Sequence, residues 1–371
     1  MRIALVVHDY ERGFGHSRYV VELAERFRHR HEVHVFAHRI DRTGGEGITF
    51  HTVPAARTTA LVSVLSFYGT ATLRLGRGGG FDIIHGQGLI AAQANVLTAH
   101  LCNRSWFQAQ RALGYDYTAR QRIFENVLVP LEDRLYRKTN ASVIAISRRL
   151  EDELRTLHGC RAPIHVIPHG VDVERFHPAL RGQVRQEMRA ALDVGPEERC
   201  ALYVGDIRKG AAVTVEALAR VPELSLDMVT RSDIGSLRAR VERLGLGKRV
   251  RFHPASHTIE RFYAAADLFV CPSPYDAFGM VVTEAMASGL PVIVSRAAGA
   301  SELITPREDG LVLEDAGDIS GLAAHLRELA VDRDFAERLG WAAHLRMQTL
   351  TWDEVARRTL HVYEQVLEKR A

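Results

Sequence analysis

The chain has 371 residues, of which 46% are hydrophobic, so its length favours two domains and its composition can supply two cores. A formal net charge of only +3 disfavours a nucleic-acid-binding protein, because such a protein carries a concentrated basic face. No apolar run approaches the roughly 20 residues that cross a bilayer, and the widely separated cysteines form no metal or redox motif. We therefore expect a cytoplasmic protein with reduced, buried thiols and no nucleic-acid partner.

Short apolar segments alternate with helical patterns through the first half of the chain. Strands are expected at residues 3–7, 33–36, 81–85, 95–100 and 142–147. Each segment is apolar on both faces, which is typical of a parallel sheet covered by helices. Ser17 is expected to be the N-cap of the first helix, whose apolar positions include Tyr19, Leu23 and Phe27.

The same alternation starts again after residue 200. Strands are expected at residues 201–204, 225–229, 250–252, 268–270 and 291–294, and helices near 211–220, 233–245, 256–266 and 280–288. Two successive series of this kind predict an α/β protein with two Rossmann-like, doubly wound domains. Prolines and a glycine between Pro163 and Pro178 place the boundary, so we expect domains at 1–167 and 168–352. Two facing sheets of this type would form one central cleft at their carboxyl edges.

The most informative segment runs from Ser273 to Pro291. It follows a strand and predicts a short helix whose first turn offers free amide groups and a positive dipole end to a diphosphate. Gly279 lets the backbone approach a ligand closely, and Glu284 can reach the hydroxyls of a ribose. The residues alone also permit an ordinary strand–turn–helix connection in which Glu284 is solvated.

This segment resembles the signature of the retaining glycosyltransferases of family 4, which have the GT-B fold of two Rossmann-like domains. In that signature two acids are separated by seven residues and enclose Phe-Gly; here Asp276 holds the first position and Glu284 the second. The resemblance implies a catalytic Asp276 that contacts the donor sugar. The residues expected to bind the donor nucleotide and its diphosphate are Arg208, Lys209, His253, Phe278, Gly279, Met280, Val281 and Glu284.

Two further segments extend the resemblance. Residues 203–210 match the family's Val-Gly-Arg loop that ends in Lys-Gly, with Asp206 at the position of the first basic residue. Arg208 and the catalytic Lys209 could still neutralise a leaving diphosphate, provided that Asp206 turns away or is salt-bridged. Residues 167–172 match the interdomain Pro-Asn-Gly-Val-Asp segment, with His169 in place of asparagine.

In the first half, the Gly-rich loop before the first helix resembles the family's loop near the acceptor and the donor phosphates. Its expected site residues are Gly13, Phe14, Gly15 and His16. The resemblance also makes His100, at the end of Thr98-Ala99-His100, a catalytic residue beside the reacting sugar, although a core histidine is the alternative. His85 lines the acceptor side or belongs to a structural turn.

The resemblance implies a retaining transferase that moves a hexosyl or N-acetylhexosaminyl group from a nucleotide-sugar donor, with UDP as the expected nucleotide. The acceptor would be a glycan, a lipid-linked sugar or a small molecule, and residues 353–371 would cross back onto the first domain. Another enzyme on this scaffold, either a nucleotide-sugar epimerase or a phosphorylase, and a non-catalytic sugar-nucleotide sensor remain alternatives.

No cofactor or metal is expected. Asp332-Arg333-Asp334 matches a D-x-D metal motif, but it predicts the solvated start of a helix instead. The apolar residues 60–68 and the arginine- and aromatic-rich residues 104–122 permit a peripheral contact with the inner face of the membrane. Their alternative is a buried crossover helix followed by an acceptor loop.

Overall fold

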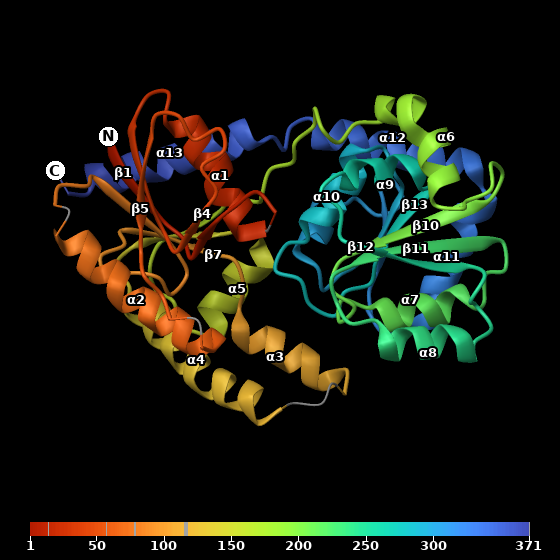
Figure 1. The fold of residues 1–371 in the computed structure, drawn as a ribbon, viewed down its shortest axis with the longest axis horizontal. Coiled ribbons are helices and arrows are strands. Elements are labelled where there is room, and N and C mark those ends of the chain that lie inside the picture. The colour runs from red at the N-terminus through yellow and green to blue at the C-terminus, as the bar shows by residue number, and fades with distance from the viewer. Residues whose placement is uncertain (14, 57, 78, 115–117, 371) are drawn as a thin grey trace. The chain divides into compact units, whose positions relative to one another are not determined.

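The computed structural model describes residues 1–370 apart from residues 14, 57, 78 and 115–117. The chain divides into two compact units, and Figure 1 shows a twisted sheet with helices on both faces in each of them. Unit 1 comprises Met1–Gly170 together with Trp352–Ala371, and unit 2 comprises Val171–Thr351. The predicted fold of two Rossmann-like, parallel-sheet domains is therefore confirmed.

The described residues of unit 1 form a seven-stranded parallel sheet in the order β5-β3-β1-β6-β7-β8-β9. Its strands are β1 Arg2–Val6, β3 Glu32–Ala37, β5 Ile48–Thr52, β6 Ile83–Gln87, β7 Val96–Ala99, β8 Ser142–Ala145 and β9 Ile164–Val166. A short parallel pair joins β2 Asp9–Tyr10 to β4 Arg39–Ile40. The helices are α1 Gly15–Phe27, α2 Ala60–Arg77, α3 Asn103–Ala112, α4 Ala119–Lys138, α5 Arg148–Thr156 and α13 Trp352–Glu368.

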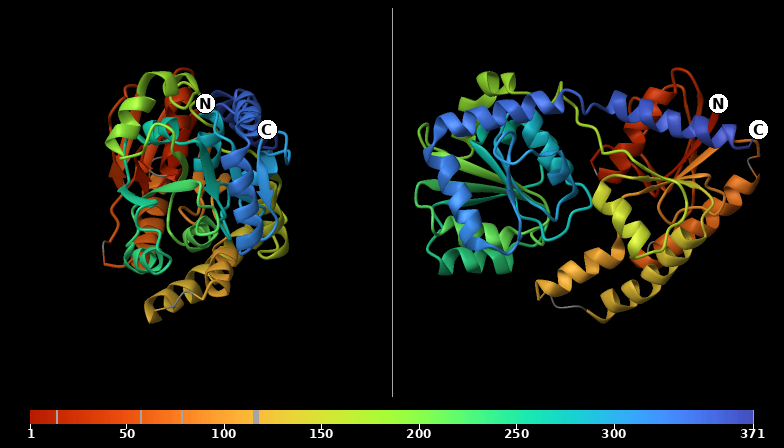
Figure 2. Two further views of the ribbon diagram at one scale, coloured as in Figure 1. Left: turned by 90° about the vertical axis from the view of Figure 1, so that its right-hand side faces the viewer. Right: turned by 180° about the vertical axis from the view of Figure 1, so that it is seen from behind.

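Alternating side chains of the central strands serve the two faces of this sheet. Ala4 and Val6 of β1 pack in one cluster with Phe67 of α2. The other face is covered by α1 and α13, which lie side by side in Figures 1 and 2. Although α13 follows unit 2 in the sequence, it packs as part of unit 1.

The start of α1 corrects one expectation. Ser17 was expected to be the N-cap, but the helix begins at Gly15 and Ser17 lies inside it. The Ser17 hydroxyl instead donates to the carbonyl oxygen of Asp9 at 2.6 Å. A serine hydroxyl can hydrogen-bond the backbone both as an N-cap and from inside the first turn of a helix. The sequence pattern alone therefore does not distinguish the two positions.

The described residues of unit 2 form a six-stranded parallel sheet in the order β12-β11-β10-β13-β14-β15. Its strands are β10 Arg199–Val204, β11 Leu224–Thr230, β12 Val250–Pro254, β13 Leu268–Cys271, β14 Val292–Ser295 and β15 Leu311–Leu313. The helices are α6 Ala179–Ala191, α7 Ala211–Leu218, α8 Gly235–Arg243, α9 Ile259–Ala265, α10 Met280–Ala287, η1 Gly299–Leu303, α11 Ile319–Val331 and α12 Arg333–Met347. Asp332, from the D-x-D sequence, is the N-cap of α12 and accepts from the Phe335 amide.

Two apolar clusters enclose this second sheet. Ala201 and Tyr203 of β10 join a cluster with α7, α8 and α11, whereas Cys200 and Leu202 join a cluster with α9 and α10 on the opposite face. In both units the strand order reverses beside the first strand, between β1 and β6 and between β10 and β13. Open parallel sheets bind ligands at the carboxyl ends of the strands at such a reversal.

Candidate active site

In unit 2 the loops that leave β10 and β13 lie against each other at the reversal. Gly210 has a φ of 93°, and a Cβ atom there would lie 2.1 Å from the carbonyl oxygen of Pro272. Only glycine allows both this backbone conformation and this approach. The two loops therefore form one continuous surface at the carboxyl edge of the sheet. They carry half of the residues expected to bind the donor, namely Arg208, Lys209, Phe278 and Gly279.

Lys209 and Asp276 meet across this surface. The Lys209 ammonium donates to Asp276 Oδ2 at 2.6 Å, and Asp276 Oδ1 accepts from the amide of Phe278 at 3.3 Å. Burial lowers the pKa of Lys209, but the attraction and hydrogen bond of Asp276 outweigh it and hold that pKa above its ordinary value. Lys209 is thus a fixed cation, which is what a leaving diphosphate requires.

Arg208 is engaged within its own loop. Its Nε and Nη2 atoms donate to the two carboxylate oxygens of Asp206 at 2.9 and 2.7 Å. Burial raises the pKa of Asp206, but the hydrogen bonds from Arg208 outweigh it and hold the pKa below its ordinary value. Asp206 is therefore salt-bridged, which is the condition that the sequence analysis set for a phosphate site here. The same ion pair neutralises Arg208, one of the two expected cations.

Helix α10 begins at this edge with Gly279 as its N-cap. Gly279 has a φ of 97°, and the first turn, Met280 and Val281 included, has no side chain that caps it. Glu284 lies one turn further on and is 8% exposed, and its Oε2 atom accepts from the hydroxyl of Tyr263 on α9 at 3.1 Å. The helix thus presents amide donors at its start and a positioned carboxylate behind them.

His253 ends in a polar network of the sheet. Its Nε2 atom lies 2.8 Å from Asp227 Oδ1, and the same carboxylate accepts from Arg251 at 2.8 Å and from the Cys200 thiol at 2.9 Å. Burial raises the pKa of Asp227, but hydrogen bonds from His253 and Arg251 outweigh it and lower the pKa. The Asp227 carboxylate inside the sheet therefore holds His253 near the carboxyl end of β12.

In unit 1 a histidine cluster lies at the carboxyl ends of β6 and β7. His100 Nε2 is 2.7 Å from the side-chain oxygen of Gln87, and His100 Nδ1 is 3.3 Å from His169 Nε2. Burial and the neighbouring His169 lower the pKa of His100 well below its ordinary value, and burial lowers the pKa of His169 to about 3. Both rings are therefore neutral, with His100 donating to Gln87 and accepting from His169.

The expected Gly-rich loop opens α1 beside this cluster. Gly13 and Gly15 are exposed, and the ring of His16 lies 6.0 Å from the ring of His100, measured between centroids. Phe14 lies outside the described residues. Among the expected site residues of unit 1, the structure thus brings together His16 and His100 and adds His169, which the sequence singled out only as a departure from the family's asparagine.

His85 is fully buried in unit 1. Its Nδ1 and Nε2 atoms are each 2.6 Å from a hydroxyl oxygen, that of Tyr363 on α13 and that of Thr98 on β7. Burial lowers its pKa to about 3. These contacts favour the structural alternative for His85, because Nδ1 joins α13 to the sheet and Nε2 joins β6 to β7 within it.

The sequence spacing did not reveal a Cys–His–Asp chain in unit 1. Cys102 Sγ is 3.3 Å from His158 Nε2, and His158 Nδ1 is 2.7 Å from Asp133 Oδ1. Cys102 and His158 are fully buried, and burial raises the pKa of the thiol to about 11. A protonated, inaccessible thiol is not a nucleophile. The hydrogen-bonded series Cys102–His158–Asp133 is therefore structural, and it joins α3 and α4 to the residues after α5.

Within the described part of the chain, no group of three or more His, Cys, Asp or Glu side chains is arranged to hold a metal ion. No helix among the same residues combines the length and the apolar character needed to cross a membrane.

Comparison with known proteins covers both units. Residues 15–175 match the family described as Glycosyltransferase Family 4, and residues 184–346 match the family described as Glycosyl transferases group 1. The D-inositol 3-phosphate glycosyltransferase of Jonesia denitrificans is 30% identical over 313 residues, which are 77% of this chain and 72% of that relative.

Solved structures are similar over nearly the whole chain. The sucrose-phosphate synthase of Thermosynechococcus elongatus has a TM-score of 0.81 and 25% identity, and the similarity covers 99% of each chain. Anabaena HepE in complex with UDP-glucose has a TM-score of 0.73 and 19% identity over 98% of this chain and 100% of HepE.

Proposed function

Because the chain belongs to the family 4 glycosyltransferases and has their GT-B fold, we propose that it transfers a hexosyl or N-acetylhexosaminyl group with retention of configuration. The donor is a nucleotide sugar with UDP as its nucleotide, and unit 2 binds it. Unit 1 receives the acceptor, which is a glycan, a lipid-linked sugar or a small molecule. The proposed reaction needs neither a cofactor nor a metal.

The observation that carries this proposal is the Lys209–Asp276 pair beside the start of α10. Lys209 is half-buried, its pKa is held above the ordinary value, and it is fixed at the sheet edge where nucleotides bind in such folds. The amides of Met280 and Val281 belong to the first turn of α10, which follows the neighbouring loop. Together they offer fixed positive charge to the two phosphates of a donor.

The proposed chemistry follows from where charge develops. As the bond between the sugar and the diphosphate breaks, negative charge grows on the departing phosphate, and Lys209 with the α10 amides stabilises it. The departing phosphate takes the proton of the acceptor hydroxyl on the same face of the sugar, which retains the configuration. Asp276 accepts from a sugar hydroxyl while it holds Lys209, and Glu284 accepts from the ribose hydroxyls.

His100 takes a positioning part in this proposal. It is neutral, so it can accept from or donate to a sugar hydroxyl without placing a second charge beside the reacting carbon. Its present partners are Gln87 and His169, so a sugar hydroxyl would replace one of them.

The choice of UDP rests on similarity. HepE was solved with UDP-glucose and shares the fold of this chain. The acceptor is less restricted, because one similar protein is named for inositol phosphate and another for sucrose phosphate. Exposed apolar side chains of α2 and α4, such as Leu73 and Ile123, support a peripheral membrane contact for a lipid-linked acceptor.

Hydrolysis of UDP-glucose in the absence of acceptor tests the proposal, with proton NMR following the released sugar. The donor is α-linked, so retention predicts that α-glucose appears first and mutarotates afterwards. Release of β-glucose first would contradict retention. A protein that binds UDP-glucose but never cleaves it, even with a panel of sugar and sugar-phosphate acceptors, would be a sensor rather than a transferase.

A further inference from the structure

Unit 2 contains a cavity of about 280 Å³ at the amino edge of its sheet, opposite the edge that carries Lys209 and Asp276. Arg199 is the first residue of β10, Asp267 directly precedes β13, and Pro291 directly precedes β14. The residues that line the cavity are Pro178, Arg181, Arg199, Asp267, Gly289, Pro291, Ala336, Glu337 and Trp341. The proposed donor site uses none of them.

Asp267 at the back of the cavity is saturated with donors. Its side chain is 4% exposed and accepts from Arg185 at 2.7 Å, from Arg199 at 3.1 Å and from Arg189 at 3.3 Å. The amide of Cys200 donates to the same carboxylate at 2.9 Å. One buried carboxylate thus already satisfies three guanidinium groups and a backbone donor.

Arg181 provides a fourth guanidinium group, which is not hydrogen-bonded to the Asp267 carboxylate. Its Nη2 atom is 3.9 Å from Asp267 Oδ1, beyond hydrogen-bond distance, and among the described residues its side chain has no hydrogen-bond acceptor. Burial and the like charge of Arg185 lower the pKa of Arg181 to about 10, so it remains a cation at neutral pH. Its side chain is 30% exposed, so water solvates the guanidinium in the free protein, and a bound anion would supply the charged acceptor that no described side chain provides.

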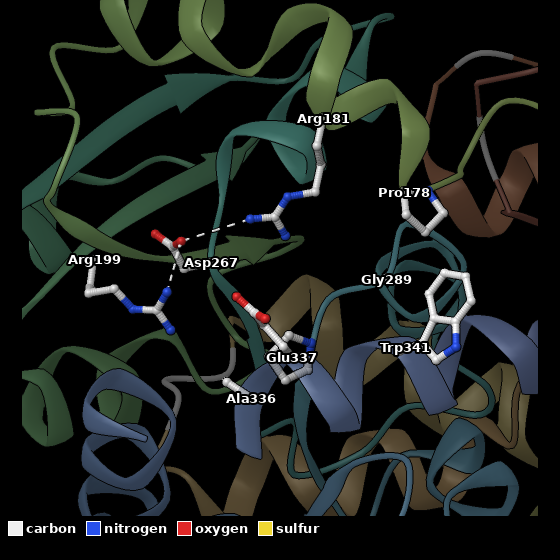
Figure 3. A pocket seen from close by; sticks show the side chains of 9 residues that line it. Pro178, Arg181, Arg199, Asp267, Gly289, Ala336, Glu337 and Trp341 are labelled. Atoms are coloured by element: carbon white, nitrogen blue, oxygen red, sulfur yellow. Dashed lines mark hydrogen bonds and ion pairs between the residues drawn. The ribbon is translucent and has the colours of Figure 1, made fainter. Parts of the chain in front are cut away.

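The cavity also offers groups that suit a hydroxylated ring. Trp341 on α12 is 57% exposed and stands at the side of the cavity, as Figure 3 shows, although tryptophan is a residue that folding usually covers. An exposed indole face packs against the apolar face of a sugar. Glu337, one turn earlier on α12, provides a carboxylate that accepts hydroxyl hydrogen bonds.

We propose that this cavity binds a sugar phosphate, with the phosphate on Arg181 and the sugar ring between Trp341 and Glu337. Arg181 and Arg199 line the cavity with Asp267 and Glu337, so the charges of the lining itself balance. Arg185 and Arg189 contact the same Asp267 carboxylate without lining the cavity, and they add two positive charges nearby that favour an anion over a neutral sugar. The volume suits a ligand of this size better than a whole nucleotide sugar. The site is separate from the donor site and does not depend on its assignment.

Calorimetric titration of the full chain, saturated with UDP, tests this proposal with glucose 6-phosphate, inorganic phosphate and glucose as probes. We expect glucose 6-phosphate to bind most tightly, phosphate more weakly, and glucose not at all. Arg181→Gln should weaken both anions at least tenfold, since a charge-assisted bond is lost. Trp341→Ala should weaken glucose 6-phosphate alone. Arg243→Gln, an exposed arginine on α8, makes the same charge change away from the cavity and should alter nothing.

Three results would overturn the proposal. The first is an equal affinity for glucose 6-phosphate in the wild-type protein and in Arg181→Gln. The second is loss of binding in the presence of UDP, which would place the probe in the donor site. The third is no binding of either anion at millimolar concentration. Since the readout is binding and not turnover, none of them bears on whether the chain transfers sugars.

Discussion

At the scale of single residues, the sites of both units depend on groups whose charge is set by burial. Lys209 stays charged because Asp276 compensates its burial, whereas His85, His100 and His169 stay neutral because no carboxylate in the described part of the chain does so for them. In the proposed function the charged Lys209 serves the diphosphate and the neutral His100 serves a sugar hydroxyl, whereas His85 has a structural role.

Lys209→Gln should lower turnover of UDP-glucose by ~10²–10³-fold, because the charge on the leaving diphosphate would lose its fixed cation. Arg208→Gln is the matched control: it removes a neighbouring positive charge that Asp206 already neutralises, so we expect a much smaller loss. Initial rates of UDP release measure both. Equal losses in the two variants would mean that Arg208 leaves Asp206 to bind the donor.

His85 should make unit 1 sensitive to acid. Its pKa is about 3 in the folded protein and near the ordinary 6.5 in the unfolded chain, so the unfolded chain binds the extra proton between these values. The contribution of His85 to stability should be constant above about pH 7 and fall by at most about 1.4 kcal/mol per pH unit as the pH drops below 6. His100 and His169, whose pKa values are also lowered, add to the total slope. His85→Gln should flatten this slope in urea titrations at several pH values. Parallel slopes would show that His85 titrates alike in both states.

At the scale of elements, the donor surface exists because the loop after β10 and the loop after β13 are packed together at Gly210. Gly210→Ala should destabilise unit 2 by more than about 2 kcal/mol, since it combines a left-handed backbone with a collision against Pro272. Gly182→Ala is the control: Gly182 lies in α6 with open space around it, and alanine there should stabilise by up to about 1 kcal/mol. Thermal unfolding of the two variants distinguishes the effects, and a harmless Gly210→Ala would contradict the packed-loop description.

The strands also show which parts of the fold can be predicted from the sequence. The central strands were predictable because they are apolar on both faces, as with β10 and β13. The edge strands β5, β9 and β15 were not predicted, since β5 alternates polar residues and the other two have only three residues each. An edge strand is defined by its single neighbour in the sheet, which a local pattern does not contain.

The candidate site divides in the same way. Lys209 and Asp276 were each predictable from a strand end and a family resemblance, but they are 67 positions apart and their hydrogen bond is a product of the fold. The contact of His100 with His169 and the chain from Cys102 to Asp133 are also long-range. Sequence motifs identify the functional groups, but only the folded structure shows which of them form hydrogen bonds or ion pairs with each other.

At the scale of the whole molecule, the two units have separate cores and their proposed ligands differ. Unit 2 is one continuous segment, whereas unit 1 is completed by α13 from the end of the chain. The hydrogen bond between His85 and Tyr363 and the ion pair between Arg26 and Asp353 fasten α13 to unit 1. The donor should therefore stabilise unit 2 directly, and truncation of α13 should damage unit 1.

In the proposed function, unit 2 binds a nucleoside diphosphate through Lys209, the start of α10 and Glu284. Thermal unfolding of the full chain with UDP, GDP, ADP and dTDP tests it most directly, with Glu284→Gln in parallel and Tyr263→Phe as a control that keeps the carboxylate. UDP at 100 times its dissociation constant should stabilise unit 2 by about 2.7 kcal/mol, more than the other diphosphates do, and Glu284→Gln should need at least tenfold more UDP for the same shift. No shift with any diphosphate, or the same shift at the same UDP concentration in Glu284→Gln, would contradict the account.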